Sequence, residues 1–217
     1  MWKAEYVLFD CDGVLVDSET LTQNVLSEEL ARYGLMIEPT QVGTMFIGGT
    51  MAGVMQVARD MGAALPDDWL DHIYATLFAE LGARCEIIPG VHEMLDRLDA
   101  AGIGYATCSN GPMAKMEVTM GRTGLWERFE GRVFSAHECA ASKPAPDVYL
   151  KGAALAGIDP TRCAVIEDSA TGAKAGRAGG MPCFGYVAQT DAAKLASICD
   201  EVFEEMTALP RLLGISA

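Results

Sequence analysis

The stretch Tyr6-Val7-Leu8-Phe9-Asp10-Cys11-Asp12-Gly13-Val14-Leu15-Val16-Asp17-Ser18-Glu19 decides how this chain is organised. It leads from an apolar, strand-like segment directly into two carboxylates and a glycine. Alternate side chains of an extended strand share a face, so Asp10 and Asp12 lie on one side while Cys11 points away. Carboxylates this close repel each other unless a cation lies between them or one holds a proton. The stretch predicts a reactive site at the end of the first strand, although an acidic turn is the simpler interpretation.

Composition limits what such a site can bind. The chain has 217 residues, half of them hydrophobic, which is enough for one core or for a core with a small inserted domain. Its net charge of −14 argues against binding to nucleic acids or anionic membranes. No apolar run approaches membrane-spanning length, so we expect a soluble, cytoplasmic protein. A small phosphorylated metabolite stays compatible with this charge if a divalent cation or local donors hold the phosphate. No feature of the sequence fixes an oligomeric state.

Hydrophobic periodicity predicts two domains. Helices are expected at 18–33, 51–61 and 68–81, and a glycine follows each of them. Three consecutive helices without a strand indicate a separate helical domain over residues 17–85. The core domain is then expected to comprise residues 1–16 and 86–217.

After Pro89 the predicted secondary structure alternates between short apolar strands and helices. Strands are expected at 103–108, 132–134, 164–166, 182–187 and 201–203, with helices at 91–101, 113–121, 146–156 and 171–178. This alternation predicts an α/β fold with a Rossmann-like parallel sheet and helices on both faces. In such open sheets, sites form at the carboxyl ends of the strands.

Polar residues follow the later strands at the expected places. The segment Thr107-Cys108-Ser109-Asn110-Gly111 opens a helix whose N-terminus can hold an anion, although an ordinary helix cap explains it equally well. Lys143 stands before a proline and could be a solvated loop charge. Glu167 and Asp168 follow four apolar residues, and burying them without a cation would cost several kcal/mol. Their joint occurrence predicts one shared site.

These segments resemble a known family in their order and local sequence. Leu8-Phe9-Asp10-x-Asp12-Gly13-Val14-Leu15, Ser109, Lys143 and Glu167-Asp168 are similar to the four motifs of the haloacid-dehalogenase-like (HAD) superfamily. The helical insertion after the first motif resembles the subclass with an alpha-helical cap domain, which includes sugar-phosphate phosphatases and beta-phosphoglucomutase. The resemblance covers essentially the whole chain. It implies an enzyme, namely a Mg²⁺-dependent phosphatase that works through an aspartyl-phosphate intermediate.

The resemblance also implies a role for each motif residue. Asp10 would be the nucleophile, and Asp12 would protonate the leaving oxygen and later activate water. Mg²⁺ would be bound by Asp10, Asp168 and the backbone carbonyl of Asp12, with Glu167 as an alternative ligand or a neighbour of the ligands. The transferring phosphoryl oxygens would be held by Ser109 and Lys143, with Thr107 as a rival for the serine.

Other reactions of the family are separated by particular residues. Dehalogenation is disfavoured because Asp12 and the Glu167-Asp168 pair are present. A phosphonoacetaldehyde hydrolase needs a cap lysine, and no lysine lies between Lys3 and Lys115. A phosphosugar mutase must hold a second phosphate, whereas the cap carries only Arg32, Arg59 and Arg84.

The expected cap residues favour hydrolysis of a monophosphate. Gly48-Gly49-Thr50 lacks the arginine often found in the corresponding cap loop, and Thr22 stands where mutases place a histidine. The rest of the substrate would contact small or polar residues: Thr22, Gly48, Gly49, Thr50 and Asn110. Such a lining suits a sugar or sugar-acid phosphate. A phosphosugar mutase and an inactive binding module remain the alternatives.

Overall fold

The computed structural model describes residues 2–46, 51–187 and 192–215. Contacts within the chain divide it into two compact units. The core unit comprises Met1–Val16 and Ile87–Ala217, and the helical unit comprises Asp17–Glu86. No helix in the described part of the chain has both the length and the apolar character needed to cross a membrane.

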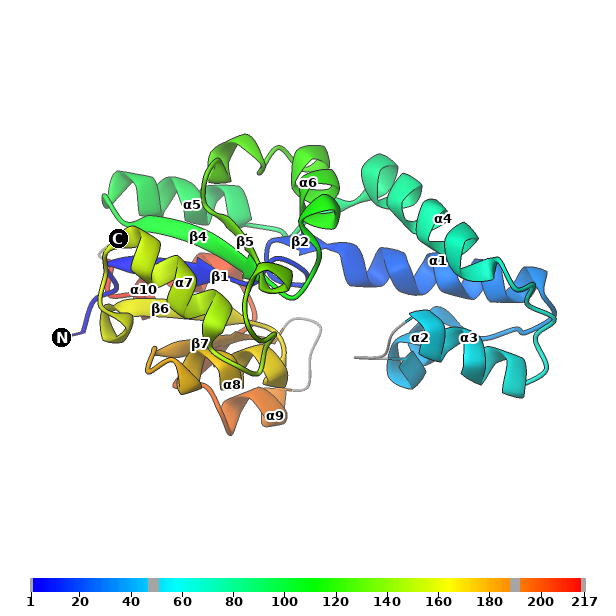
Figure 1. The fold of residues 1–217 in the computed structure, drawn as a ribbon. Coiled ribbons are helices and arrows are strands. Elements are labelled where there is room, and N and C mark those ends of the chain that lie inside the picture. The colour runs from blue at the N-terminus through cyan, green and yellow to red at the C-terminus, as the bar shows by residue number, and fades with distance from the viewer. Residues whose placement is uncertain (1, 47–50, 188–191, 216–217) are drawn as a thin grey trace. The chain divides into compact units, whose positions relative to one another are not determined.

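The core unit contains a six-stranded parallel sheet (Figure 1). Its strands are β1 (Tyr6–Phe9), β4 (Gly104–Ser109), β5 (Val133–Ser135), β6 (Cys163–Glu167), β7 (Cys183–Tyr186) and β8 (Glu201–Phe203). They lie in the order β5-β4-β1-β6-β7-β8, so the chain extends the sheet on one side of β1 and then on the other. Binding crevices form where the strand order reverses in this way, at the carboxyl ends of the strands.

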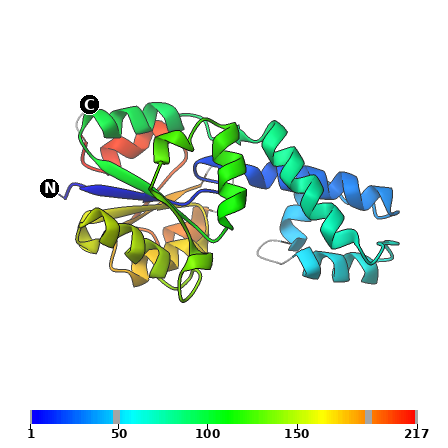
Figure 2. The ribbon, with the colours of Figure 1, turned by 45° about the horizontal axis from the view of Figure 1, so that its top comes forward.

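Helices cover both faces of this sheet, which confirms the predicted fold class (Figure 2). One face carries α5 (Val91–Ala100), α6 (Met113–Arg122) and α10 (Leu209–Leu212), and the other carries α7 (Asp147–Ala156), α8 (Ala170–Ala178) and α9 (Ala192–Ala196). Short 3₁₀ helices occupy Glu127–Phe129, Ala136–Glu138, Pro160–Arg162 and Met206–Ala208.

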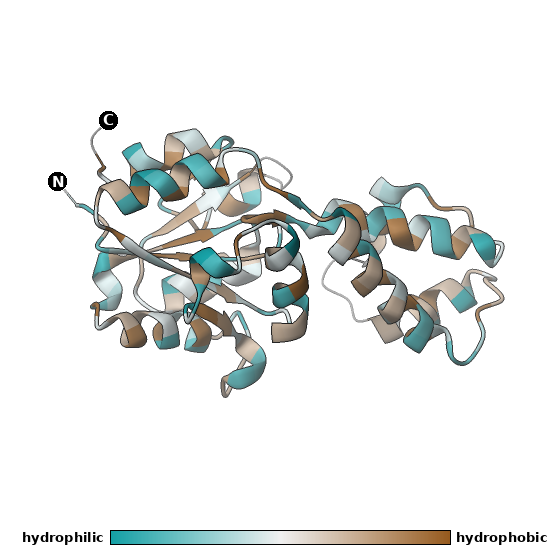
Figure 3. Ribbon diagram, turned by 90° about the horizontal axis from the view of Figure 1, so that it is seen from above, coloured by the Kyte–Doolittle hydropathy of each residue, from teal (hydrophilic) through white to brown (hydrophobic). Residues whose placement is uncertain are grey.

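Alternation along the strands explains why both faces are covered. In β4, Ala106 and Cys108 are fully buried in the apolar cluster beneath α7 and α8, together with Leu8 and Val165. Tyr105 points to the other face, where its hydroxyl contacts Asp99 of α5. Figure 3 shows the sheet strands as mainly hydrophobic, while the surrounding helices alternate between hydrophobic and hydrophilic positions. The sheet is therefore buried on both faces, as parallel sheets usually are.

The helical unit has its own apolar core. Its helices are α1 (Ser18–Arg32), α2 (Pro39–Phe46), α3 (Met51–Asp60) and α4 (Trp69–Arg84). Leu30, Trp69 and Ile73 are fully buried in this second cluster. The chain passes between the units at β2 (Val16–Asp17) and β3 (Glu86–Ile87), which pair as a two-stranded sheet.

Helix α2 was not predicted from the sequence, and it contains Pro39 and Gly43, two residues that disfavour the interior of a helix. Pro39 stands at the first helical position, where its missing N–H removes no hydrogen bond. Gly43 lies inside the helix, where a Cβ would approach the side-chain amide nitrogen of Gln23 to 2.7 Å. The absence of a side chain at Gly43 therefore lets α2 pack closely on α1.

Candidate active site

The strand register places Asp10 at the centre of the carboxyl edge. Phe9, the last residue of β1, pairs with Thr107 of β4 and with Ile166 of β6. The backbone N–H of Asp10 donates to the carbonyl of Ile166 at 2.9 Å. The carboxylate of Asp10 is thus fixed by the central strand of the sheet, between residues that end the two neighbouring strands.

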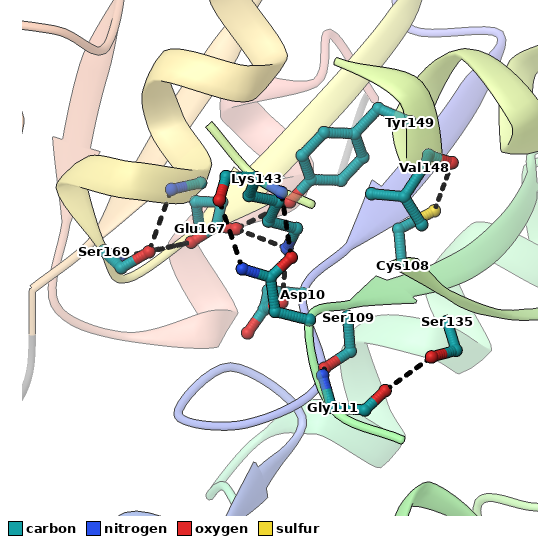
Figure 4. A network of polar contacts seen from close by, with 12 residues as sticks. Asp10, Cys108, Ser109, Gly111, Ser135, Lys143, Val148, Tyr149, Glu167 and Ser169 are labelled. Atoms are coloured by element: carbon teal, nitrogen blue, oxygen red, sulfur yellow. Dashed lines mark hydrogen bonds and ion pairs between the residues drawn. The ribbon is translucent and has the colours of Figure 1, made fainter. Parts of the chain in front are cut away.

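Lys143 joins two of these strand ends (Figure 4). Its Nζ lies 2.5 Å from Oδ1 of Asp10 and 2.7 Å from Oε1 of Glu167, and its side chain is only 3% exposed. The ammonium also lies 4.6 Å from the centre of the Tyr149 ring, a distance at which cation–π attraction acts. Burial alone would lower the pKa of Lys143, but the two carboxylates outweigh it and raise that pKa. Lys143 therefore carries a positive charge at neutral pH.

Asn110 holds the backbone of Lys143 in place. Its Oδ1 accepts from the N–H of Lys143 at 3.0 Å, and its Nδ2 donates to the carbonyl of Lys143 at 3.3 Å. The sequence suggested that Asn110 contacts the substrate. That contact stays a prediction, and the structure shows that both ends of its amide bind the loop that carries the lysine.

Glu167 is completely buried, and each of its two carboxylate oxygens accepts two hydrogen bonds. Oε1 accepts from Lys143 and from the hydroxyl of Tyr149 at 2.7 Å. Oε2 accepts from the backbone N–H of Ser169 at 3.2 Å and from its Oγ at 2.9 Å. Gly172 makes room for this carboxylate, because a Cβ at that position would collide with it. Four hydrogen bonds of this kind offset the cost of burying the charge.

Three carboxylates of the site could hold a cation. One oxygen from each of Asp10, Glu167 and Asp168 lies within 4.8 Å of the others. Asp168 lies against the turn after β1, where a Cβ on Gly13 would collide with its carboxylate and where φ is +80°. Gly13 therefore allows the two acidic segments to meet. Oxygen donors in this arrangement fit a hard divalent cation such as Mg²⁺.

The balance of charge in the site also favours a cation. Burial raises the pKa of Asp10 to about 7; Lys143 opposes this rise, and the charges of Glu167 and Asp12 add to it. The ammonium groups of Lys115 and Lys143 pair with Asp12, Asp10 and Glu167. A divalent cation beside Asp10 and Asp168 would add positive charge to this group of four carboxylates.

Ser109 lies beside the second aspartate of the first motif. Its buried Oγ accepts from the N–H of Gly111 at 2.9 Å, which leaves the hydroxyl proton for an oxygen in the site. A Cβ built on Gly111 would lie 3.2 Å from Oγ of Ser109 and 3.4 Å from Oδ2 of Asp12, so the three groups converge. Thr107 is fully buried two residues earlier, and its Oγ1 has no hydrogen-bond partner among the described residues.

Three residues of this network were not singled out from the sequence. Lys115 in the first turns of α6 forms an ion pair with Asp12, with 2.7 Å between Nζ and Oδ1. Tyr149 and Ser169 bind Glu167, as described above. Ser169 could have been found, because a serine before an apolar helix is typical of an N-cap, and its Oγ does accept from the N–H of Gly172. Lys115 and Tyr149 have no comparable local signal.

The predicted cap residues divide into two groups. Gly48, Gly49 and Thr50 lie outside the described residues. Thr22 lies on α1 of the helical unit, and its hydroxyl donates to the carbonyl of Ser18 at 2.8 Å.

Comparison with known proteins gives the class of this chain. Residues 4–180 match the family model of haloacid dehalogenase-like hydrolases, and the chain belongs to this family. It is 28% identical to the 6-phosphogluconate phosphatase of Escherichia coli K12 over 98% of this chain and 96% of the relative. It is 32% identical to hexitol phosphatase A of the same organism over 88% and 87% of the two chains.

A solved structure extends this similarity to the fold. The HAD family hydrolase from Deinococcus radiodurans R1, crystallised with bound phosphate and sodium, superposes with a TM-score of 0.89. The two chains are 32% identical, and the match covers 99% of this chain and 96% of the other. The family assignment therefore rests on sequence and structure over nearly the full length.

Proposed function

We propose that this enzyme is a Mg²⁺-dependent phosphatase that hydrolyses a small phosphorylated metabolite through an aspartyl-phosphate on Asp10. The observation that carries the proposal is the Asp10–Lys143–Glu167 network at the strand-order reversal, with Asp168 beside it. A buried carboxylate, a buried ammonium and a set of oxygen ligands are what phosphoryl transfer requires, because that reaction depends mainly on positioning and charge neutralisation.

The residues take the following parts in the reaction. A carboxylate oxygen of Asp10 attacks phosphorus while the bond to the leaving oxygen breaks. Asp12 gives a proton to that oxygen, and afterwards removes a proton from the water that hydrolyses the aspartyl-phosphate. Lys143 and Ser109 donate hydrogen bonds to the phosphoryl oxygens. Asn110, Tyr149 and Glu167 hold Lys143 in place for this task.

Asp10, Asp168 and the backbone carbonyl of Asp12 would hold the magnesium ion. A bound divalent cation supplies positive charge that offsets repulsion between the anionic phosphate and the carboxylates. Glu167 stays a predicted ligand, but its four hydrogen bonds favour a role in orienting Lys143.

The substrate class is proposed from two considerations. The two curated relatives described above are named as phosphatases of a phosphorylated sugar acid and of hexitol phosphates. The net charge of −14 disfavours large polyanions, so the phosphate has to be recognised by local groups. We infer a sugar, sugar-acid or sugar-alcohol monophosphate, and assign the helical unit Asp17–Glu86 the part of a cap that contributes to its recognition.

The test is phosphate release from a panel of sugar, sugar-acid and hexitol phosphates, with Mg²⁺ or with EDTA. We expect hydrolysis with Mg²⁺, its loss with EDTA, and a fall of about 10³-fold or more in Asp10→Asn. Asp71→Asn, which changes an exposed acid of the helical unit, is the matched control and should retain full activity. Substantial activity in Asp10→Asn would exclude the proposed nucleophile.

Two further measurements separate the alternatives. In Asp12→Asn, hydrolysis of the intermediate should slow, so acid-quenched protein should carry phosphate on Asp10 by mass spectrometry. Conversion of glucose 1-phosphate to glucose 6-phosphate, monitored alongside phosphate release, would instead identify a mutase. The absence of any phosphate release across the panel would favour a binding module.

A further inference from the structure

We propose that Lys115 is a positioning residue that holds the carboxyl group of Asp12 at the leaving oxygen and thereby governs proton transfer to it. The inference rests on the proposed phosphatase reaction and adds a residue to it. Lys115 and Asp12 are 103 positions apart in the sequence, yet Nζ lies 2.7 Å from Oδ1.

The backbone around Gly111 brings the two side chains together. Lys115 lies in the first turns of α6, where its N–H donates to the carbonyl of Pro112 at 3.0 Å. A Cβ on Gly111 would lie 3.4 Å from Oδ2 of Asp12 and 3.8 Å from Cδ of Lys115. The lysine stem thus passes over Gly111 to reach the carboxylate. Ser109 binds the N–H of the same glycine, so the acid, the phosphate donor and the lysine share one turn.

The ion pair is shielded from solvent. The side chains of Lys115 and Asp12 are 24% and 18% exposed, unlike most ion pairs of this protein, in which at least one partner is far more exposed. Shielded charge-assisted hydrogen bonds of this length are stronger and more directional than surface pairs. Lys115 therefore restricts the orientation of the Asp12 carboxyl group.

Lys115 stays in contact with Asp12 when the first chemical step changes the charge of that side chain. In that step the bond between Asp10 and phosphorus forms, the bond to the leaving oxygen breaks, and the proton of Asp12 moves to that oxygen. Asp12 then becomes a carboxylate, and the ammonium of Lys115 stabilises the negative charge that appears there.

This role predicts that loss of Lys115 affects two aryl phosphate substrates differently. Phenyl phosphate has a leaving oxygen that needs the proton, whereas 2,4-dinitrophenyl phosphate has one that leaves without it. In Lys115→Met the burst of phenol release should slow by about tenfold to a hundredfold for phenyl phosphate, as expected for partial loss of general acid catalysis. The burst with 2,4-dinitrophenyl phosphate should change by less than about threefold, because no general acid is needed. KM should stay near the wild-type value for both esters.

Two controls accompany this measurement. Lys151→Met removes another lysine–carboxylate pair of the core unit, with Glu138 on the 3₁₀ helix Ala136–Glu138, and should leave both bursts unchanged. Lys115→Arg retains the charge and should restore most of the rate with phenyl phosphate. If Lys115→Met fails to fold, Lys115→Arg compared with Lys115→Gln supplies the same contrast.

Several results would overturn the inference. Equal slowing with both esters would make Lys115 structural, and a rise in KM alone would make it a binding group for the substrate. If Asp12→Asn shows the selective loss with phenyl phosphate and Lys115→Met does not, Lys115 has no part in the step while the proposed function stands. If Asp10→Asn remains active, the proposed function fails, and the role of Lys115 fails with it.

Discussion

At the scale of single residues, the site depends on how one buried lysine is held. Lys143 contacts Asp10 on one side and Glu167 on the other, and Glu167 is itself held by Tyr149 and Ser169. The two adjacent acids at the end of β6, Glu167 and Asp168, therefore differ in environment. Glu167 is fully buried, with both oxygens bonded by protein donors, whereas Asp168 is partly exposed beside Asp10.

Tyr149→Phe should weaken catalysis without removing any group that touches the phosphate. The substitution deletes the hydroxyl that donates to Glu167 at 2.7 Å but keeps the ring against Lys143. A buried hydrogen bond to a charged group contributes about 1.5–3 kcal/mol, so we expect a measurable fall in thermal stability. We also expect kcat to fall several-fold with KM nearly constant. Tyr74→Phe, at a half-exposed position of α4, should change neither quantity.

The raised pKa of Asp10 predicts that, without a bound cation, the free energy of unfolding depends on pH. Its pKa is about 7 in the folded protein, against an ordinary value of 3.8. The folded state therefore keeps a proton that the unfolded state releases between about pH 4 and pH 7. The contribution of Asp10 to stability falls as pH rises through that window and stays low above it.

Asp10→Asn should remove this cost. In EDTA at pH 8 we expect the variant to melt several degrees above the wild type, while at pH 4 the two should melt at similar temperatures. Added Mg²⁺ should stabilise the wild type more than the variant, because the cation favours the ionised carboxylate. Thermal denaturation monitored by circular dichroism measures the melting temperatures at pH 8, at pH 4 and with added Mg²⁺. A difference in melting temperature that is the same at both pH values would contradict the assignment.

At the scale of elements, glycines decide how closely helices and turns approach the buried charges. Gly172 lies in the first turn of α8 directly against the carboxylate of Glu167, and Gly13 opens the turn after β1 for Asp168. A side chain at either position would displace an acid of the site. The geometry of the site therefore depends on two positions that carry no functional group.

Gly172→Ala and Gly121→Ala form a matched pair that tests this dependence. Both glycines lie in helices of the core unit, but a Cβ at Gly121 in α6 would meet nothing within 4 Å. Gly121→Ala should stabilise the protein by about 0.5–1 kcal/mol, as expected for alanine in a helix. Gly172→Ala should destabilise it and lower kcat through displacement of Glu167. Urea denaturation measures the stability, and phosphate release measures kcat. Equal effects of the two substitutions would contradict the close approach of α8 to Glu167.

The sequence predicted the strands and the acidic strand ends because these depend on local patterns. Four apolar residues before Asp10 and four before Glu167 indicate buried strands, and parallel topology brings their carboxyl ends together. The partners of those acids depend on tertiary contacts instead. Lys115 approaches Asp12 only after α6 has packed on the sheet, and Tyr149 reaches Glu167 only from the opposite helical layer. The contact of Asn110 with Lys143 could not be predicted for the same reason, since the loop that its amide binds is 33 residues away.

At the scale of the whole molecule, each unit has an apolar cluster of its own among the described residues. The cluster beneath α7 and α8 belongs to the core unit, and the cluster around Leu30 and Trp69 belongs to the helical unit. The two clusters share no residue. We therefore expect truncation of a side chain in one cluster to act mainly on the unit that contains it.

Trp69→Ala tests this separation. Trp69 is fully buried, and truncation of a buried tryptophan costs about 3–5 kcal/mol. Hydrogen exchange should become faster in α1 and α4, while the amides of β1, β4 and β6 keep their protection. Tyr74→Ala, which truncates a half-exposed side chain of the same helix, should leave both units protected. Faster exchange throughout the sheet in Trp69→Ala would show that the units unfold together.

The paired strands β2 and β3 lie where the chain passes between the core unit and the helical unit. The core chain leaves at Val16 and returns at Ile87 along this short ribbon. The ion pairs of Asp10 and Asp12 with Lys143 and Lys115 are formed by residues of the core unit. We therefore expect residues 17–86 to be exchangeable as a cassette for other segments with matching ends. With the proposed role of the helical unit, such chimeras would differ in the substrate that they recognise and would keep the residues around Asp10.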